Sequence, residues 1–330
     1  MSNLKLVNKT EVKNILKMKD VLRAVEDAFG SWGRGEVQMP PKSYLIFDKE
    51  NGDLRSMPAY LPGKNAGVKI VTVHPDNRFK ELPTVMALCV LNDPNTGLPV
   101  AVMDAGLLTA IRTGAAGGIA SKWLAKESST EVGLIGAGVQ AKYQMEAHFE
   151  VMNVQSVKIF DPNKEAVDSL SRWLSEVSPS LDLSVTSLED ACDVDVLITT
   201  TPVRKPVVME GMVVRPHTHI NAIGADAEGK QEVDSNLIKK CKVIVDDWTQ
   251  TSHSGEINVP CHEGWFSKEM VAGEIGTIVA YEDVSFKNSL TLFDSTGLAI
   301  QDMATGNIVL EKATENGMGL DWNPLDYFGN

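Results

Sequence analysis

The spacing of apolar residues predicts one helix followed by a set of strands in the first hundred residues. Residues 20–32 place apolar side chains at helical spacing, and Gly30 and Gly33 are signals for the end of that helix. From Met39 onward, short runs rich in β-branched residues predict strands at residues 43–47, 54–57, 67–73, 84–91 and 98–104. Because strands and helices do not alternate regularly here, we expect a helix with a largely antiparallel sheet.

The pattern changes after residue 130, where strands alternate with helices. Apolar runs predict strands at residues 132–135, 156–160, 195–200, 218–222, 242–245 and 291–293. Helical segments or loops separate them, which is typical of a parallel sheet with helices on both faces. Residues 297–309 resume the helical period and are expected to carry the chain back to the first domain. The predicted fold class is α/β, with a Rossmann-type doubly wound parallel sheet and a second, α+β domain.

The first strand of this second part runs into a glycine loop that opens a helix. The loop reads Gly136-Ala137-Gly138-Val139-Gln140-Ala141. Gly136 suits a tight turn, Gly138 lets backbone N–H groups approach a pyrophosphate, and Ala141 lets helix and strand pack closely. The helix N-terminus adds unpaired N–H groups and a positive dipole. Such a loop also serves simple strand–helix connections, so its context decides the interpretation.

Asp161 supplies part of that context, because it ends the 156–160 strand 20 residues after Ala141. An acidic side chain at this place is expected to accept hydrogen bonds from the adenosine ribose of a dinucleotide. Asp161 could also cap the helix that follows Pro162, and both roles can hold together. We expect NAD rather than NADP because no arginine follows directly, although Lys164 lies close in the sequence.

Small, polar or acidic residues follow the other predicted strands. In an open parallel sheet, ligands bind outside the carboxyl ends of the strands. The candidate site residues are therefore these endings: Thr200-Thr201-Pro202, Gly224-Ala225-Asp226, Asp246-Asp247 and Asp294-Ser295-Thr296-Gly297. Asp226 is the strongest of them as a group that takes part in chemistry.

Four basic residues are candidates for binding an anionic substrate. Arg112 is the only charge in the helix predicted at residues 105–121, where its neighbours are mostly alanine and glycine. Burying an unpaired cation is costly, so we expect a dedicated partner such as a substrate carboxylate or a cofactor phosphate, rather than an arginine that only reaches out to solvent. Lys42, Arg55 and Lys69 lie in or beside predicted strands. Lys69 either faces solvent or points into a cleft, where burial or Arg112 would lower its pKa.

Composition and charge exclude several classes of function. The 330 residues suggest two domains, and 43% apolar with 23% charged residues is ordinary for a globular protein. A net charge of −13 argues against a nucleic-acid or anionic-membrane partner. Four scattered cysteines and the lack of a signal-peptide core or long apolar run predict a cytoplasmic protein. The sequence has no metal-binding histidine pattern, G-x-S-x-G, P-loop or EF-hand motif, which leaves redox chemistry at a nicotinamide.

Nine segments together resemble the ornithine cyclodeaminase/mu-crystallin family, most closely its archaeal-type alanine dehydrogenase branch. They lie at residues 38–42, 53–59, 82–88, 101–104, 112–118, 199–202, 219–226, 255–259 and 293–302. The resemblance covers nearly the whole chain and implies a homodimer. It implies that residues 1–120 with 303–330 form a substrate-binding and dimerisation domain, and that residues 121–302 form an NAD-binding Rossmann domain.

The resemblance also implies roles for individual residues. The family's active-site lysine and aspartate fall on Lys69 and Asp226, and its carboxylate-binding arginine falls on Arg112. Lys42 matches a second basic position, which is arginine in many members. The expected NAD contacts are Arg112, Thr113, Gly136, Ala137, Gly138, Val139, Gln140, Asp161, Thr200, Gly224, Asp226 and Ser295.

Arg55 is where this sequence departs from the cyclodeaminases, which carry a glutamate that would hold the distal amino group of ornithine. A cation there should repel a diamino acid and suit a short substrate with one carboxylate. We therefore expect NAD-dependent oxidative deamination of L-alanine to pyruvate and ammonia, reversible as reductive amination. The alternative is reduction of a cyclic imine, either a ketimine or pyrroline-2-carboxylate. Ornithine cyclodeamination and a non-catalytic NAD(P)H-dependent ligand-binding protein are the weaker alternatives.

Overall fold

The computed structural model describes residues 4–323, which divide into two compact units. The described part of unit 1 comprises residues 4–31, 35–112 and 298–323, and unit 2 comprises residues 32–34 and 113–297. The predicted placement of residues 324–330 in the substrate domain lies outside the described residues. Each unit is built around one sheet, and the division into a substrate unit and an NAD unit stays a prediction.

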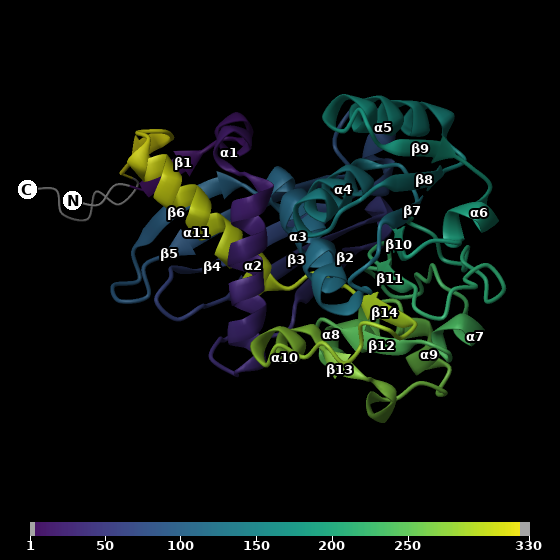
Figure 1. The fold of residues 1–330 in the computed structure, drawn as a ribbon. Helices are drawn as coiled ribbons and strands as arrows, with labels where there is room; N and C mark the ends of the chain where they lie inside the picture. The colour runs from purple at the N-terminus through teal and green to yellow at the C-terminus, as the bar shows by residue number, and fades with distance from the viewer. Residues whose placement is uncertain (1–3, 324–330) are drawn as a thin grey trace, which may run out of the picture. The chain divides into compact units, whose positions relative to one another are not determined.

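Unit 1 contains a seven-stranded sheet in the order β15-β1-β6-β5-β4-β3-β2 (Figure 1). The strands are β1 (Leu4–Val7), β2 (Ser43–Phe47), β3 (Gly52–Ala59), β4 (Ala66–Val73), β5 (Val85–Asn92), β6 (Pro99–Asp104) and β15 (Leu320–Trp322). Strands β2 to β6 are antiparallel neighbours, while β1 pairs parallel with β6 and antiparallel with β15. The largely antiparallel sheet that the sequence predicts is confirmed, with two short strands added at its edge.

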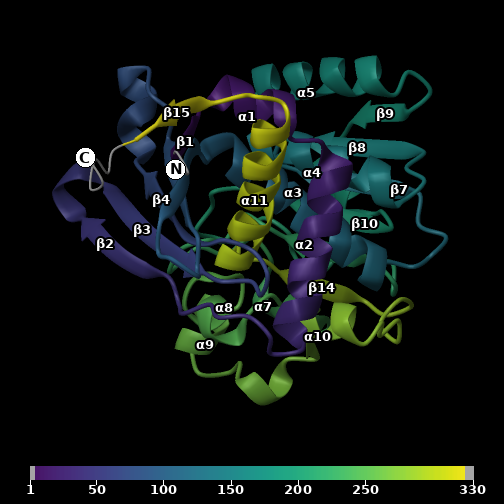
Figure 2. The same cartoon turned by 90° about the vertical axis from the view of Figure 1, so that its left-hand side faces the viewer.

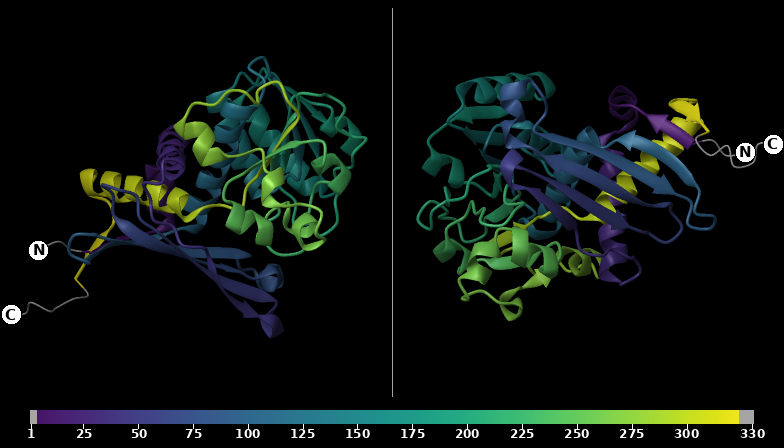
Figure 3. Two further views of the ribbon diagram at one scale, coloured as in Figure 1. Left: turned by 90° about the horizontal axis from the view of Figure 1, so that it is seen from below. Right: turned by 180° about the vertical axis from the view of Figure 1, so that it is seen from behind.

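Two of the helices of unit 1 contact its sheet. The helices of this unit include α1 (Lys9–Ile15), α2 (Met18–Gly33) and α11 (Ala299–Glu315), with short 3-10 turns η1 (Asp48–Glu50) and η2 (Pro75–Lys80) between strands. Helix α1 contacts β6, and α11 contacts β3, β4 and β5. Figures 2 and 3 show α11 in yellow, lying along β3, β4 and β5. A side chain on Gly67 would meet the carbonyl oxygen of Val90 at 2.2 Å and Met303 Sδ at 3.0 Å. The glycine therefore permits the close packing of strand and helix.

Unit 2 contains an eight-stranded sheet in the order β13-β12-β14-β11-β10-β7-β8-β9, and its neighbouring strands are parallel. The strands are β7 (Glu131–Ile135), β8 (Ser156–Phe160), β9 (Asp182–Val185), β10 (Val196–Thr199), β11 (His219–Ala222), β12 (Lys242–Val245), β13 (Gly273–Glu274) and β14 (Thr291–Asp294). The chain winds outward from β7 through β8 to β9, and then returns to β10 on the other side of β7. This reversal is the switch point at which doubly wound sheets bind ligands, and the predicted Rossmann-type fold is confirmed.

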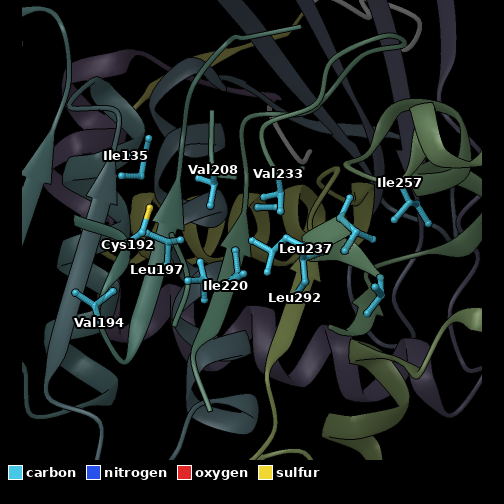
Figure 4. Packing of buried hydrophobic residues seen from close by; sticks show 14 of the residues in the cluster. Ile135, Cys192, Val194, Leu197, Val208, Ile220, Val233, Leu237, Ile257 and Leu292 are labelled. Carbon is cyan, nitrogen blue, oxygen red and sulfur yellow. The ribbon is translucent and has the colours of Figure 1, made fainter. Parts of the chain in front are cut away.

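Helices cover both faces of the parallel sheet. They are the unit 2 part of α3 (Gly106–Leu124), α4 (Val139–Val151), α5 (Lys164–Val177), α6 (Leu188–Cys192), α7 (Ser235–Ile238), α8 (Trp248–Ser254), α9 (Asn258–His262) and α10 (Ile275–Ala280), with the 3-10 turn η3 (Lys268–Met270). Figure 4 shows the apolar core on one face, which includes Leu197 and Ile220. Neighbouring strand positions such as Val196 and Ile198 point into the core on the other face. Burial on both faces explains why these strands read as continuous apolar runs.

No helix in the described part of the chain is long and apolar enough to cross a membrane.

Candidate active site

Lys69 lies on the covered face of the unit 1 sheet, in the middle of β4. It is opposite Met57 on β3 and Cys89 on β5, and only 1% of it is exposed. Its neighbour Ile70 is on the other face and is 39% exposed. The alternative that Lys69 faces solvent is therefore wrong, and the strand alternation instead turns its ammonium group into the interior.

Asp302 binds two of the four cations that the sequence singles out in unit 1, Lys69 and Arg112. Lys69 Nζ lies 2.9 Å from Asp302 Oδ1 and 2.8 Å from Oδ2. Arg112 donates from Nε to Asp302 Oδ1 at 2.9 Å and from Nη1 to Gln301 Oε1 at 2.9 Å. Asp302 is fully buried and Arg112 is 5% exposed. The anionic partner expected for Arg112 is thus, in the first instance, a carboxylate of the chain itself.

The surroundings of Lys69 bring its pKa close to neutrality. Burial is the main cause, and the neighbouring Arg112 cation adds to it, so that the pKa falls from 10.5 to about 7. The Asp302 carboxylate acts in the opposite direction, and Lys42 lowers the pKa slightly further. Burial also raises the pKa of the Cys89 thiol to about 12, so Cys89 adds no charge beside the lysine. Lys69 can therefore exist as both amine and ammonium near pH 7, as a group that transfers protons requires.

Arg55 is paired more closely than the sequence analysis anticipated. It is 6% exposed and binds Asp53 through two hydrogen bonds, from Nε to Oδ1 at 2.8 Å and from Nη2 to Oδ2 at 3.0 Å. Its guanidinium also lies 5.5 Å from the centre of the Tyr44 ring. Because the Asp53 carboxylate offsets its charge, Arg55 repels a second amino group of a substrate less than a lone cation would.

In unit 2, the glycine loop connects β7 to α4. It is tightly packed at Gly136 and open at Gly138. Gly136 has a φ of 101°, which favours glycine, and a side chain there would meet Thr200 Oγ1 at 2.8 Å. The N-cap of α4 is Gly138, so no side chain of the N-cap residue satisfies the first N–H groups of the helix. A Cβ atom on Gly138 would meet nothing within 4 Å. The N-terminus of α4 is therefore accessible to an anion such as a pyrophosphate.

Asp161 belongs to this loop rather than to the helix after it. Its Oδ2 accepts a hydrogen bond from Ala137 N at 2.7 Å, and its Oδ1 accepts one from Asn163 N at 2.7 Å. The N-cap of α5 is Asn163, whose side chain accepts from Ala166 N. The suggestion that Asp161 caps the helix is therefore wrong, because α5 begins at Lys164 and Asn163 is its N-cap.

Two buried polar atoms at the carboxyl edge of the unit 2 sheet suit a dinucleotide. Within residues 4–323, neither Ser295 Oγ nor Gln140 Oε1 has a hydrogen-bond partner. Buried polar atoms are normally satisfied, so a bound group is the ready explanation for both. Val139, the first residue of α4 and the sequence neighbour of Gln140, is 71% exposed. The residues in the loop and at the strand ends therefore fit the polar ligand that the sequence predicts.

The remaining predicted site residues also belong to unit 2. Asp226 follows β11 and its Oδ1 lies 2.5 Å from Lys230 Nζ. Gly224 N donates to Glu232 Oε2 at 2.7 Å, and the carbonyl oxygen of Thr113 accepts from Gln144 Nε2 at 3.1 Å. The structure thus brings Lys69, Arg112 and Lys42 together in unit 1, and the pairing of Lys69 with Asp226 in catalysis stays a prediction.

Sequence reasoning missed Asp302 and Gln301 as site residues. Both lie in the first turn of α11, after the buried Ala299 and Ile300, and both are fully buried. Two consecutive polar residues on an otherwise apolar stretch of helix are a signal that could have identified them, since such groups need partners when buried. Among the described residues, no group of histidine, cysteine and acidic side chains could hold a metal ion.

Comparison with known proteins agrees with these features. Residues 3–317 match the model of the ornithine cyclodeaminase/mu-crystallin family. Alanine dehydrogenase of Archaeoglobus fulgidus is 46% identical over 95% of this chain and 96% of its own length. A solved archaeal alanine dehydrogenase dimer with bound NAD has a TM-score of 0.94 and 45% identity, covering 98% of this chain and 99% of that one.

A second solved structure shows how widely the fold is used within one family. Thermococcus litoralis Δ1-pyrroline-2-carboxylate reductase, in complex with NADH and L-proline, has a TM-score of 0.92 and 36% identity, covering 96% of this chain and all of that one. The resemblance seen in the sequence motifs is therefore confirmed over the full length of the fold. This chain belongs to the ornithine cyclodeaminase/mu-crystallin family.

Proposed function

We propose that the protein is an NAD-dependent oxidoreductase that deaminates L-alanine to pyruvate and ammonia and also catalyses the reverse reductive amination. The observation that carries the proposal is the buried cluster of Lys69, Arg112 and Asp302, in which a lysine of near-neutral pKa lies beside a fixed guanidinium. The 46% identity to an alanine dehydrogenase over nearly the whole chain supports this choice of substrate.

NAD is the cofactor that the unit 2 loop fits best. The open N-terminus of α4 would hold the pyrophosphate, Asp161 the adenosine ribose, and Ser295 and Gln140 the remaining polar groups. A carboxylate at the ribose position disfavours the 2′-phosphate of NADP by like-charge repulsion. When bound, NAD accepts a hydride from the substrate Cα.

The cations of unit 1 would bind and orient the amino acid. Arg112, fixed by Asp302 and Gln301, is the proposed partner of the substrate carboxylate, together with Lys42. Oxidation of the amino acid gives an imine, water adds to that imine, and the resulting carbinolamine loses ammonia. As an amine, Lys69 can take a proton from the attacking water, and as an ammonium it can return a proton to the leaving nitrogen. Asp226 is the second candidate for these proton transfers.

Reduction of a cyclic imine is the second candidate function. It is favoured by the likeness to the Thermococcus litoralis reductase and by a cation pair that suits the carboxylate of any α-imino acid. The two functions are separated by NADH consumption with pyruvate and ammonia, measured against NADH consumption with pyrroline-2-carboxylate. The alanine proposal expects faster turnover with pyruvate and ammonia, and the opposite order would replace it with the second function.

We further propose a homodimer that forms through the outer face of the unit 1 sheet. This face exposes apolar side chains on neighbouring strands, including Ile70 at 39%, Leu88 at 53% and Leu45 at 60%. Such an apolar face normally lies against another protein surface, and the archaeal alanine dehydrogenase was solved as a dimer. Light scattering should give twice the chain mass, and Leu88→Lys should lower the measured mass toward that of one chain.

The free state of all four cysteines supports a cytoplasmic location.

A further inference from the structure

Three completely buried carboxylates at the carboxyl edge of the unit 2 sheet are linked to one another through backbone N–H groups. They are Glu232, Glu256 and Asp294. Asp294 ends β14 and accepts hydrogen bonds from Glu256 N at 2.8 Å and Ile257 N at 3.0 Å. The Glu256 carboxylate in turn binds the backbone N–H of Glu232. Through these hydrogen bonds, each carboxylate binds the backbone at the next acid. They connect the end of β14, by way of Glu256 and Glu232, to the loops after β10 and β11.

The Glu232 carboxylate is the last of the three, and it joins those two loops. Its Oε1 accepts from Thr201 N at 2.6 Å and from Thr201 Oγ1 at 2.7 Å. Its Oε2 accepts from Gly224 N at 2.7 Å and from Thr199 Oγ1 at 2.8 Å. Each carboxylate oxygen therefore receives one backbone N–H, from the loop after β10 on one side and the loop after β11 on the other.

Gly224 shows how tightly the loops surround this carboxylate. A side chain on Gly224 would meet the carbonyl oxygen of Thr201 at 2.2 Å and Glu232 Cδ at 2.7 Å. The segment after β10 also reaches the glycine loop, because Thr200 Oγ1 donates to the Gly136 carbonyl oxygen at 3.4 Å. The Glu232 carboxylate thus fixes backbone that adjoins the loop proposed to hold the pyrophosphate.

We propose that Glu232 is a positioning residue for the dinucleotide, which holds the loops after β10 and β11 in the conformation that binds it. The inference rests on the proposed NAD site, and Glu232 acts through Thr201 and Gly224 rather than by touching the cofactor. Ligands of doubly wound sheets bind at the carboxyl ends of the strands beside the switch point, where these loops lie.

The glutamine variant of Glu232 separates charge and hydrogen bonding from size. An amide has one accepting atom and one donating atom, whereas both oxygens of Glu232 receive a backbone N–H. In either orientation, the amide nitrogen of Glu232→Gln would face a backbone donor, Thr201 N or Gly224 N. One loop must therefore lose its hydrogen bond or move away.

Glu256 offers a matched control, since it is equally buried but binds asymmetrically. Its Oε1 accepts from Glu232 N at 2.9 Å and Val233 N at 2.6 Å, while Oε2 has only the longer contact with Glu232 N at 3.1 Å. An amide placed with its oxygen at Oε1 keeps both backbone bonds. Burial, and after it the nearby Glu232 carboxylate, raises the pKa of Glu256 well above its usual range. Glu256→Gln therefore keeps both backbone hydrogen bonds at its oxygen, and its amide nitrogen replaces the oxygen that makes the longer contact with Glu232 N.

The test compares NADH binding by the full-length wild-type protein, Glu232→Gln and Glu256→Gln, followed by NADH fluorescence at a temperature where thermal melts show each protein folded. We expect about tenfold weaker binding for Glu232→Gln, because a backbone hydrogen bond of the cofactor loops is lost, and binding within about twofold of wild type for Glu256→Gln. Wild-type affinity in folded Glu232→Gln would overturn the proposal, and so would an equal loss in Glu256→Gln.

Two further outcomes are covered by the same titrations. If Glu232→Gln does not fold, the double variant Thr199→Val/Thr201→Val removes two hydroxyl donors to the same carboxylate at nearly constant volume. Weaker NADH binding by this variant supports the proposal, and unchanged binding overturns it. If the wild-type protein itself binds no NADH, the proposed cofactor is wrong and the inference fails with it. If the wild-type protein and Glu232→Gln bind NADH equally well, the proposed cofactor stands and only the role of Glu232 is overturned.

Discussion

Replacing Asp302 by asparagine should make Lys69 a weaker base. The carboxylate lies 2.8 Å from Lys69 Nζ and stabilises the ammonium form, against burial and the Arg112 cation, which favour the amine. The substitution keeps the size of the side chain, removes this stabilising charge and replaces one accepting oxygen with a donating nitrogen. The pKa of Lys69 should therefore fall below its value of about 7.

The size of the change follows from the geometry. Two unit charges at this distance interact by about 6 kcal/mol at an effective dielectric constant of about 20. Relaxation of the site and entry of water reduce the effect to the one to three pH units that are typical of opposite charges in contact, or about 1.4–4 kcal/mol. A pKa near 5 would leave only about 1% of Lys69 protonated at pH 7. Stability should also fall by about 3–5 kcal/mol, because two buried cations lose their shared anion.

The assay is a pH titration of lysine labelled with ¹³C at Cε, in which Lys69 is assigned by the signal that Lys69→Met lacks. In Asp302→Asn the midpoint for Lys69 should move to lower pH. The limb of the kcat/KM profile that belongs to Lys69 should move with it. Gln301→Met is the control, because it removes a contact to Arg112 without changing the charge near Lys69. A Lys69 midpoint that stays in place or rises in Asp302→Asn would show that the Asp302 carboxylate does not stabilise the ammonium form.

Two further predictions concern unit 2. Burial lowers the pKa of His148 to about 4 and that of His219 to about 3, so the unfolded chain binds protons below pH 6.5 that the native state does not. The free energy of unfolding is therefore unaffected by these two histidines above pH 6.5, and it decreases as the pH falls from 6.5 toward their folded-state pKa values. Urea unfolding should show about 2–4 kcal/mol less stability at pH 5 than at pH 7, and less of a difference in His148→Gln; equal stability at both pH values would contradict the account. Gly136→Ala should lower the melting temperature, because a residue with a side chain at a φ of 101° costs about 1–3 kcal/mol. Gly138→Ala should melt like the wild-type protein, since a Cβ there meets nothing, but should bind NADH more weakly. A lower melting temperature for Gly138→Ala than for Gly136→Ala would be evidence against the loop geometry.

The parallel sheet and the glycine loop could be predicted because their signals are local. Gly136, Gly138 and Asp161 lie within one strand–helix–strand unit, whose apolar periods and glycine spacing are visible in a short window of sequence. The strands β1 and β15 escaped prediction because each is very short and is defined only by pairing with a distant partner.

The cation cluster shows where local signals stop. Asp302 is 233 residues from Lys69 and 190 residues from Arg112, so nothing near either cation indicates its partner. The burial of Lys69 likewise depends on α11, which packs on the sheet from the far end of the chain. The pairing of Asp53 with Arg55 is different. The two residues lie two positions apart on β3 and therefore point to the same face, so the strand pattern already contained that ion pair.

The proposed deamination of L-alanine is best tested by the initial rate of NADH formation from NAD with L-alanine, compared with L-ornithine, L-proline and other small L-amino acids. The assay uses pH 9–10, a range chosen roughly to keep substrate amines neutral. The account predicts the highest kcat/KM for L-alanine, a lower value with NADP in place of NAD, and loss of turnover in Lys69→Met while NADH binding persists. No alanine-dependent NADH formation by the wild-type protein, or undiminished turnover by Lys69→Met, would contradict it.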